Sequence, residues 1–228
     1  HFGLYIMSAI LVIGASRGSG LEFVRQYREA GHRVIATVRD EAGWARVQAL
    51  GAQALTVDVA DPASVSGLAW MLDGEKLDFA LYVAGVIRRP NALTPPTRED
   101  FDAVMHANVL GAMQAIPQVA PLVADAHGVF AFLSSSMSQI GSVPGSDAWL
   151  YRTSKAALNM AVAAAQHSYL DATLVTIDPG WVQTDLGGDS APLTVEASVR
   201  GMRETLAGLT PADQGCLLHH DGRRAAHW

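Results

Sequence analysis

The sequence predicts a single doubly wound α/β domain, with a mainly parallel sheet of about seven strands and helices on both of its faces. Short apolar runs of the kind that form buried strands alternate with longer helical patterns along the whole chain. The 228 residues contain no internal repeat, low-complexity stretch or linker, and their number suits one sizeable domain. We expect residues 7–228 to form this domain. Residues 1–6 precede a start-like Met7-Ser8, and we interpret them as a remnant of cloning.

The composition favours a small-molecule partner and a reducing compartment. The formal net charge of -6 gives no electrostatic footprint for nucleic acid or for an anionic membrane. Cys216 is the only cysteine, so no internal disulfide can form and we expect a cytoplasmic location. The apolar run Ala9 to Ile13 is far shorter than the roughly 20 residues that span a bilayer. We identify no metal site in the sequence.

The first predicted strand, Ser8 to Ile13, runs directly into a glycine-rich loop, Gly14 to Gly20. A helical pattern follows from Leu21 to Ala30 and is closed by Gly31. Strand, glycine loop and helix together open a dinucleotide-binding unit, in which the helix N-terminus offers free N–H groups to a pyrophosphate. The glycine spacing is GxxxGxG and not GxGxxG, so the alternative is an ordinary tight turn.

The second predicted strand, from Arg33, indicates which cofactor the loop holds. It places the small Thr37 and then Arg39 where an NAD site usually has an acid, and Arg17 lies in the glycine loop. Arginine suits the 2′-phosphate of NADPH, so we expect NADPH or NADP⁺ in preference to NADH. Asp40 and Glu41 come after the arginine and are interpreted as the start of a helix. An exposed surface arginine is the alternative for Arg39.

Four further strands are predicted, and three of them end in residues that suit a ligand. The third runs from Ala54 and ends at Asp58, and Asp61-Pro62 caps the helix after it. The fourth begins at Leu77 and ends in the small-residue turn Ala84-Gly85. The fifth, Gly128 to Leu133, ends in Ser134-Ser135-Ser136, and the sixth, Ala172 to Ile177, precedes Asp178-Pro179-Gly180. Carboxyl ends of parallel strands meet at one edge of the sheet, where open α/β folds bind ligands.

Two helical patterns and a possible last strand complete the prediction around the central helix described next. A helix opened by Thr97 runs to about Val119, and Asn108 and Gly111 weaken its middle, either as a purposeful distortion or as a tolerated pair. Another helix spans Thr194 to Leu206, and residues 215–218 could form a short strand.

The run from Trp149 to Leu170 predicts a helix, because it is rich in alanine and leucine and has no proline or glycine. Tyr151 and Lys155 lie four residues apart and therefore on one helix face. A protonated lysine near a phenol lowers the tyrosine pKa from about 10 toward neutrality, as a proton donor near neutral pH requires. Taken alone, the pair is more often a solvated surface feature.

In their joint order these motifs resemble the short-chain dehydrogenase/reductase family over nearly all of Met7 to Trp228. The wording around Tyr151 and Pro179 is further similar to its small C-factor-like and sniffer-like branch, which includes carbonyl reductases. The resemblance rests on the GxxxGxG loop, Asp58, Ala84-Gly85, Asn108, Ser135, Tyr151 with Lys155, and Pro179-Gly180.

The resemblance implies a Rossmann fold and a role for each of these residues. Tyr151 would be the general acid, Ser135 would hydrogen-bond the carbonyl oxygen, Lys155 would hold the nicotinamide ribose, and Asn108 would bind a water of a proton relay. Ser136 is the second choice for the serine. The cofactor would be held by Gly14, Ser16, Arg17, Gly18, Ser19, Gly20, Thr37, Arg39, Asp58, Val59, Ala84, Gly85, Tyr151, Lys155, Pro179, Gly180, Val182 and Thr184. Ile13 and Val83 depart from the family pattern and remove hydrogen bonds that brace the cofactor strands.

The implied function is NADPH-dependent reduction of an aldehyde or ketone to an alcohol, or the reverse. The alternative is an NADP(H)-binding sensor or signalling protein with little turnover. A sugar-nucleotide epimerase or dehydratase usually adds a substrate domain, for which the chain has no room. Loops at residues 86–96, 137–149 and 181–192 would shape the pocket, with Trp149 and Trp181 as an apolar wall. The resemblance also implies a homodimer or homotetramer.

Overall fold

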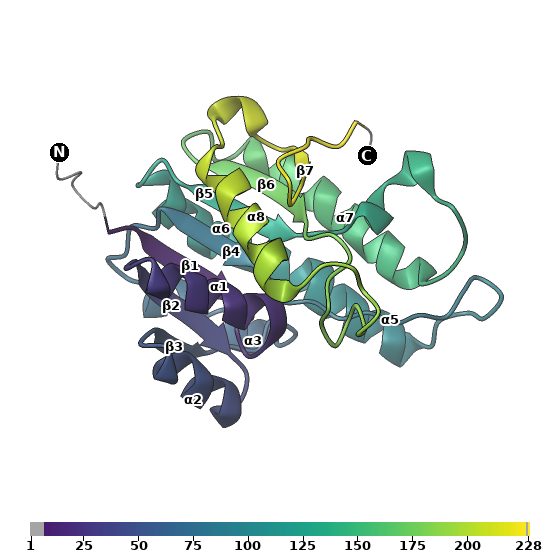
Figure 1. Ribbon diagram of the computed structural model, residues 1–228, viewed down its shortest axis with the longest axis horizontal. Helices are drawn as coiled ribbons and strands as arrows, with labels where there is room; N and C mark the ends of the chain where they lie inside the picture. Colours follow the sequence, from purple (N-terminus) through teal and green to yellow (C-terminus); the bar gives the residue numbers. More distant parts are fainter. Residues whose placement is uncertain (1–6, 227) are drawn as a thin grey trace.

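The computed structural model describes residues 7–226 and 228, so the predicted remnant at residues 1–6 lies outside the described part. Its centre is one seven-stranded sheet in the order β3-β2-β1-β4-β5-β6-β7, and every neighbouring pair is parallel. The predicted doubly wound fold class is confirmed (Figure 1). The strands are β1 (Ala9–Ile13), β2 (Arg33–Val38), β3 (Gln53–Thr56), β4 (Phe79–Tyr82), β5 (Val129–Leu133), β6 (Thr173–Asp178) and β7 (Leu217–His219).

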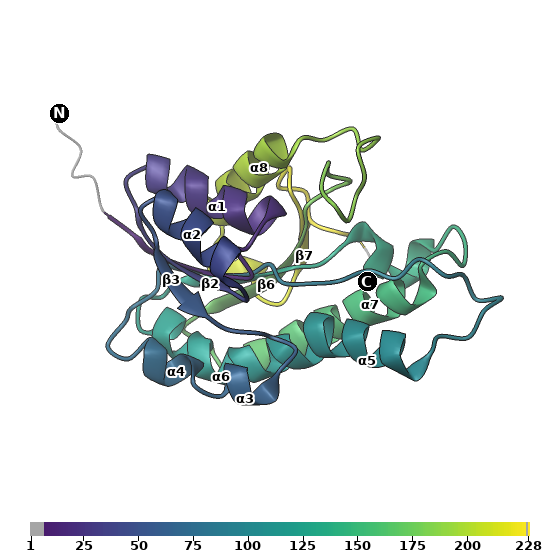
Figure 2. The ribbon, with the colours of Figure 1, turned by 90° about the horizontal axis from the view of Figure 1, so that it is seen from below.

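Helices cover both faces of the sheet, as Figure 2 shows. One face carries α1 (Gly18–Glu29), α2 (Glu41–Ala49) and α8 (Val195–Ala207). The other carries α3 (Pro62–Val65), α4 (Leu68–Met71), α5 (Arg98–Met105), α6 (Gly111–Ala124) and α7 (Trp149–Gln166). Short turns of 3₁₀-helix lie at Ser136–Ser138, Ile140–Ser142 and Pro211–Asp213.

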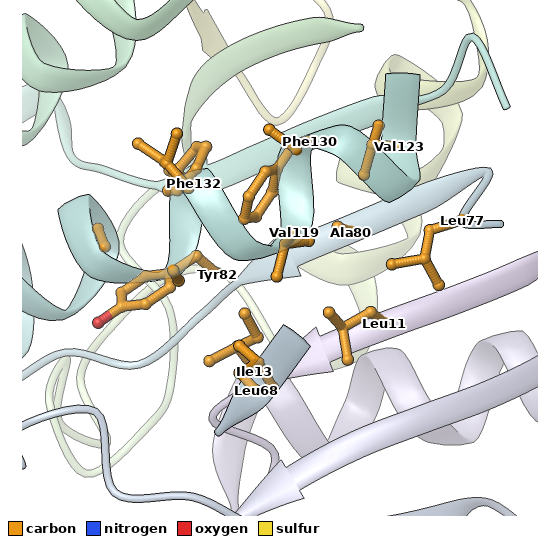
Figure 3. Packing of buried hydrophobic residues seen from close by; sticks show 14 of the residues in the cluster. Leu11, Ile13, Leu68, Leu77, Ala80, Tyr82, Val119, Val123, Phe130 and Phe132 are labelled. Carbon is orange, nitrogen blue, oxygen red and sulfur yellow. The ribbon is translucent and has the colours of Figure 1, made fainter. Parts of the chain in front are cut away.

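The period-two alternation of the strands produces two hydrophobic cores. In β1, Leu11 and Ile13 face the core under α6 and α7, whereas Ile10 and Val12 face the core under α1 and α8. Figure 3 shows the first core, where Tyr82 and Phe132 stack with ring centroids 5.9 Å apart. Because helices bury both faces, the strands read as continuous apolar runs.

The order of the strands predicts a single ligand-binding position, at the carboxyl ends of β1 and β4. From β1 the chain moves outward to β2 and β3, and it then returns to β4 on the other side of β1. Loops after β1 and β4 therefore diverge at the carboxyl ends of these strands, and open α/β sheets bind ligands at such a switch point.

The long helix predicted from Thr97 is interrupted where its sequence is weakest. Residues His106–Leu110 form a π-helix between α5 and α6, so Asn108 marks a local distortion and not a tolerated residue in a regular helix. The helix runs past the predicted end at Val119 to Ala124, and Pro117 and Pro121 lie within it. No helix in residues 7–226 and 228 is long and apolar enough to cross a bilayer.

Candidate active site

A cavity of about 1020 Å³ lies at the carboxyl ends of the strands. Its lining includes every residue predicted for catalysis or cofactor binding except Asn108, together with Ser136. The predicted site residues, which are spread from position 14 to position 184, therefore converge on one cavity.

The glycine loop is packed too closely for larger residues. A Cβ on Gly14, where φ is +91°, would lie 2.7 Å from the Ala84 nitrogen, and one on Gly20 would lie 2.1 Å from the Gly14 oxygen. The residue before α1, Arg17, makes no side-chain cap, so the first N–H groups of α1 are left to a ligand at the cavity. A close backbone and an uncapped helix N-terminus fit the pyrophosphate of a dinucleotide.

Thr37 shapes this loop instead of presenting its side chain to a ligand. Its side chain is fully buried, and its Oγ1 accepts a hydrogen bond from Gly14 N at 3.0 Å. The Ile13 carbonyl accepts from Val83 N at 2.9 Å and from Ala84 N at 3.1 Å. Ile13 and Val83 lack the hydrogen-bonding side chains of the family pattern. Backbone groups and Thr37 connect the strands there instead.

Two arginines contact Ser16 at the outer end of the cavity, Arg39 through its backbone N–H and Arg46 through its side chain. Arg39 N donates to Ser16 Oγ at 3.4 Å, and Arg46 Nε donates to the Ser16 carbonyl at 2.9 Å. Arg17 forms an exposed ion pair with Asp185 at 2.7 Å, which joins the glycine loop to the loop after β6. The sequence interpretation missed Arg46. The glycine in the same helix, Gly43, was the one hint in the sequence that α2 comes close to another segment. In the structure α2 packs against Ser16 there, and a Cβ on Gly43 would lie 2.8 Å from Ser16 Oγ.

Asp58 and Val59 line the same end of the cavity, after β3. The Asp58 carboxylate accepts a hydrogen bond from Ala60 N at 3.0 Å, and its backbone N–H donates to Ser64 Oγ at 2.9 Å. These bonds fix the turn that forms the wall expected beside the adenine.

Tyr151, Lys155 and Ser135 meet at the opposite end of the cavity. Tyr151 and Lys155 project from one face of α7, with Lys155 Nζ 5.7 Å from the centre of the tyrosine ring. The Ser135 side chain lies beside the Tyr151 hydroxyl, and their interaction lowers the pKa of Tyr151. Lys155 Nζ also donates to the Leu133 carbonyl at 2.6 Å. Ser136 is exposed, and Ser134 is buried and donates to Asn159 Oδ1 at 2.6 Å.

The electrostatics of the pair correct one prediction. Burial raises the pKa of Tyr151 to about 12, against the smaller opposite effect of the Ser135 hydrogen bond. Burial likewise lowers the pKa of Lys155 to about 8. The predicted fall of the tyrosine pKa toward neutrality is therefore wrong, because desolvation of the phenolate raises the pKa and the charge of Asp178 adds to that rise. The phenol keeps its proton at neutral pH.

Asn108 lies behind the cavity, where its side chain is fully buried. Its Oδ1 accepts from Val86 N at 2.8 Å, and its Nδ2 donates to Val86 O and to Ser154 Oγ, both at 2.9 Å. A Cβ on Gly85 would lie 3.2 Å from Asn108 Oδ1 and 3.5 Å from Lys155 Nζ. Asn108 thus ties the loop after β4 to α7 beside the lysine.

A second network, which the sequence interpretation missed, fixes the serine turn. Asn159 Nδ2 donates to Ser138 Oγ at 2.8 Å, and Ser138 Oγ donates to the Ser135 carbonyl at 2.6 Å. Asn159 follows Lys155 by one further helical step of four residues, so its place on the same face was readable from the spacing.

The loop after β6 closes the nicotinamide side of the cavity. Ser198 Oγ of α8 donates to the Pro179 carbonyl at 2.7 Å, and Gly180 adopts a φ of +80°. Val182 and Thr184 line the cavity here, as predicted. Trp181 also lines it, but Trp149 does not, so the predicted aromatic wall consists of Trp181 without Trp149. In the part of the chain that the structure describes, no group of three or more His, Cys, Asp or Glu residues is placed to hold a metal.

Comparison with known proteins places this geometry in a family. A family model described as short chain dehydrogenase matches residues 8–192. The chain is 31% identical over 231 residues to 1-hydroxy-2-glutathionyl-2-methyl-3-butene dehydrogenase of a Rhodococcus species, covering 95% of this chain and 98% of that one. It is 34% identical over 149 residues to C-signal of Myxococcus xanthus, covering 64% of this chain and 90% of that one.

Solved structures agree. A carbonyl reductase from Pseudomonas aeruginosa in complex with NADP is 28% identical with a TM-score of 0.84, covering 97% of this chain and all (100%) of that one. The carbonyl reductase Sniffer of D. melanogaster, at 24% identity and a TM-score of 0.87, shares the fold over 97% of this chain and 100% of that one. The predicted resemblance is confirmed: the chain belongs to the short-chain dehydrogenase/reductase family of NAD(P)-dependent oxidoreductases.

Proposed function

We propose that this protein is an NADPH-dependent reductase that converts an aldehyde or ketone into an alcohol, and that also runs the reverse reaction. The observation that carries the proposal is that Tyr151, Ser135 and Lys155 line one end of a cavity whose other end is a glycine-loop cradle. One cavity therefore holds a proton donor, a second hydroxyl for a carbonyl oxygen and a place for a dinucleotide.

The reduced nicotinamide, when bound, supplies the hydride that no side chain can provide. Ser135 donates a hydrogen bond to the carbonyl oxygen, and Tyr151 transfers its proton to that oxygen as negative charge develops on it. Lys155 is placed to hold the ribose hydroxyls, and its ammonium stabilises the phenolate that remains on Tyr151. Asn108 acts here as a positioning residue, through its bonds to Val86 and Ser154.

Ser135 rather than Ser136 is proposed as the serine of the site. The Ser135 side chain interacts with Tyr151 and is half-buried, whereas Ser136 is exposed. Replacement of Ser136 by alanine therefore provides a matched control for the same replacement at Ser135.

The preference for NADPH is supported by the arginines around Ser16. Arg39, which follows β2 and contacts Ser16 through its backbone N–H, and Arg17 both line the cavity, and the Arg46 side chain of α2 contacts the Ser16 carbonyl. A 2′-phosphate at this place would meet guanidinium groups and the Ser16 hydroxyl, which bind phosphate well. The complexes of related proteins from Pseudomonas aeruginosa and Burkholderia multivorans contain NADP.

The test measures NADPH consumption in the presence of a panel of aldehydes and ketones. The absorbance of the reduced nicotinamide at about 340 nm reports this consumption. Tyr151→Phe should lower kcat by about 10²-fold or more, and Ser135→Ala should also lower it strongly. Ser136→Ala should behave as wild type. Arg39→Ala should raise KM for NADPH about tenfold with little change for NADH. Full activity of Tyr151→Phe would refute the mechanism.

A sensor or signalling role is the second candidate, because C-signal is among the relatives. Such a protein would bind NADPH tightly and show no turnover across the panel. The buried Tyr151 and Lys155 at the cavity favour the enzyme, since cofactor binding alone requires no buried proton donor.

We also propose that the protein acts as a cytoplasmic homodimer or homotetramer. Phe101 of α5, Met113 of α6 and Met160 of α7 expose 44%, 53% and 70% of their surface on neighbouring helices of one face. Apolar side chains on adjoining helices suit a helix-to-helix interface between copies.

A further inference from the structure

Two adjacent arginines after β4 have different partners. Arg88 Nε donates to the Asp100 carboxylate at 2.6 Å, and Arg88 is absent from the cavity lining. Arg89 lines the cavity, and its Nη2 donates to the backbone carbonyl of Leu186 at 2.5 Å. Within residues 7–226 and 228, no carboxylate forms an ion pair with Arg89. Arg89 is thus a cation at the cavity with only a neutral hydrogen-bond acceptor.

Carboxylates near Arg89 already have cationic partners. Asp147 lines the cavity, but Arg152 donates to its Oδ1 at 2.9 Å and to its backbone carbonyl at 2.8 Å. Asp185 pairs with Arg17 at 2.7 Å. Arg89 contributes only a smaller share to the lowered pKa of Asp147, after Arg152, and it forms no ion pair with Asp147 or Asp185, so its guanidinium is available to an incoming anion.

Arg89 is exposed, and it interacts electrostatically with the reacting phenol. Its charge lowers the pKa of Tyr151, although burial has the larger, opposite effect. The bond to Leu186 joins the loop after β4 to the loop after β6, so the guanidinium lies where both loops meet the cavity. Apolar side chains share this part of the lining, namely Ile87, Met137, Trp181 and Leu186.

We propose that Arg89 binds a carboxylate of the substrate, and that the preferred substrates are apolar aldehydes or ketones that carry this carboxylate at a distance from the carbonyl group. This inference rests on the proposed reductase function and adds the substrate class. Guanidinium binds carboxylate through two parallel hydrogen bonds, and the Leu186 carbonyl takes only one of its five N–H donors. The apolar residues would hold the body of the substrate between Arg89 and Tyr151.

The experiment compares two probes that differ in charge and little in shape, 4-carboxybenzaldehyde and its methyl ester. Wild-type protein with NADPH should show a kcat/KM for the acid about tenfold or more above that for the ester. Arg89→Gln should reduce this acid-to-ester ratio by about 10- to 30-fold, and Arg89→Lys should restore part of it. Arg88→Gln, the matched control, should keep the wild-type ratio.

Three results would overturn the inference. One is a wild-type protein that reduces acid and ester equally well. Another is an Arg89→Gln variant in which kcat/KM falls by the same factor for both probes while KM for NADPH rises. Arg89 would then bind the cofactor and not the substrate. The third is an equal loss of the ratio in Arg88→Gln, which would indicate a general effect of surface charge.

A binding measurement separates this inference from the proposed function. Calorimetric titration of both probes into the NADP⁺ complex requires no turnover. If neither probe is reduced by wild type with NADPH, the reductase proposal loses its support. Tighter binding of the acid, lost in Arg89→Gln, would then still support the carboxylate site, whereas equal binding of the two probes would refute it.

Discussion

Replacement of Lys155 by methionine should change how the stability of the protein depends on pH. The ammonium is buried within the fold, where its pKa is lowered from 10.5 to about 8. Between these two values the unfolded chain binds a proton that the folded protein does not, so the free energy of unfolding rises with pH in this window. Methionine has no proton to bind, and Lys155→Met should lack this rise.

The magnitude follows from linkage. The pKa of Lys155 is about 8 in the folded protein and 10.5 in the unfolded chain. Its titration therefore raises the free energy of unfolding by about 2 kcal/mol as the pH goes from about 7 to about 9.5. The lost hydrogen bond to the Leu133 carbonyl lowers the stability of the variant at both pH values, so it does not enter this difference. The slope with pH is therefore the diagnostic quantity, and the absolute stability is not.

Urea unfolding at the two pH values measures this change in the free energy of unfolding. The experiment compares wild type, Lys155→Met and Lys76→Met. Lys76 is the only other lysine in the sequence and is exposed, so its replacement should leave the wild-type slope. The stability gain of wild type should exceed that of Lys155→Met by about 2 kcal/mol. Equal gains in wild type and Lys155→Met would show that burial does not perturb the amine, and the assignment would fail.

Three further substitutions, and one control, have defined outcomes. Gly20→Ala should destabilise the protein by about 3 kcal/mol or more in urea unfolding and abolish NADPH binding, because its Cβ would lie 2.1 Å from the Gly14 oxygen. Gly67→Ala should stay within about 0.5 kcal/mol of wild type, since its Cβ would meet only a flexible methionine end at 4.0 Å; a similar loss in both variants would contradict the packing argument. Asn108→Leu should lower stability by about 2–4 kcal/mol and kcat together, because it leaves both Val86 backbone groups without their partner; wild-type values of both would refute a positioning role. Met160→Asp should shift the molar mass in light scattering toward that of a monomer, and a wild-type protein that is already monomeric would end the dimer proposal.

The sequence was sufficient for the sheet and for the place of the cavity, because both follow from periodicity. Buried parallel strands require runs such as Ala9–Ile13 and Val129–Leu133, and their polar ends must then meet at one edge. The glycine loop was readable for a related reason, since a φ of +91° at Gly14 and the contact at Gly20 exclude almost every other residue.

The direction of the pKa shifts could not be predicted from residue types. Tyr151 and Lys155 were correctly placed on one face, but a sequence does not state how much water reaches them. Desolvation raises the tyrosine pKa and lowers the lysine pKa, and it opposes the charge effect on which the prediction was based. Likewise, Arg46 and Asn159 contribute through contacts with Ser16 and Ser138, which only the packing of α2 and α7 brings within reach.

These shifts have a consequence for the direction of catalysis. A phenol with a pKa of about 12 is almost entirely protonated at neutral pH, so Tyr151 is ready to give a proton to a carbonyl oxygen, as reduction requires. Alcohol oxidation requires the phenolate, whose population rises with pH. Lys155 keeps most of its charge below about pH 8, in the same range in which Tyr151 keeps its proton. Burial of Tyr151 thus favours the protonated phenol that the proposed carbonyl reduction requires, whereas Lys155 keeps its charge at neutral pH despite its own burial.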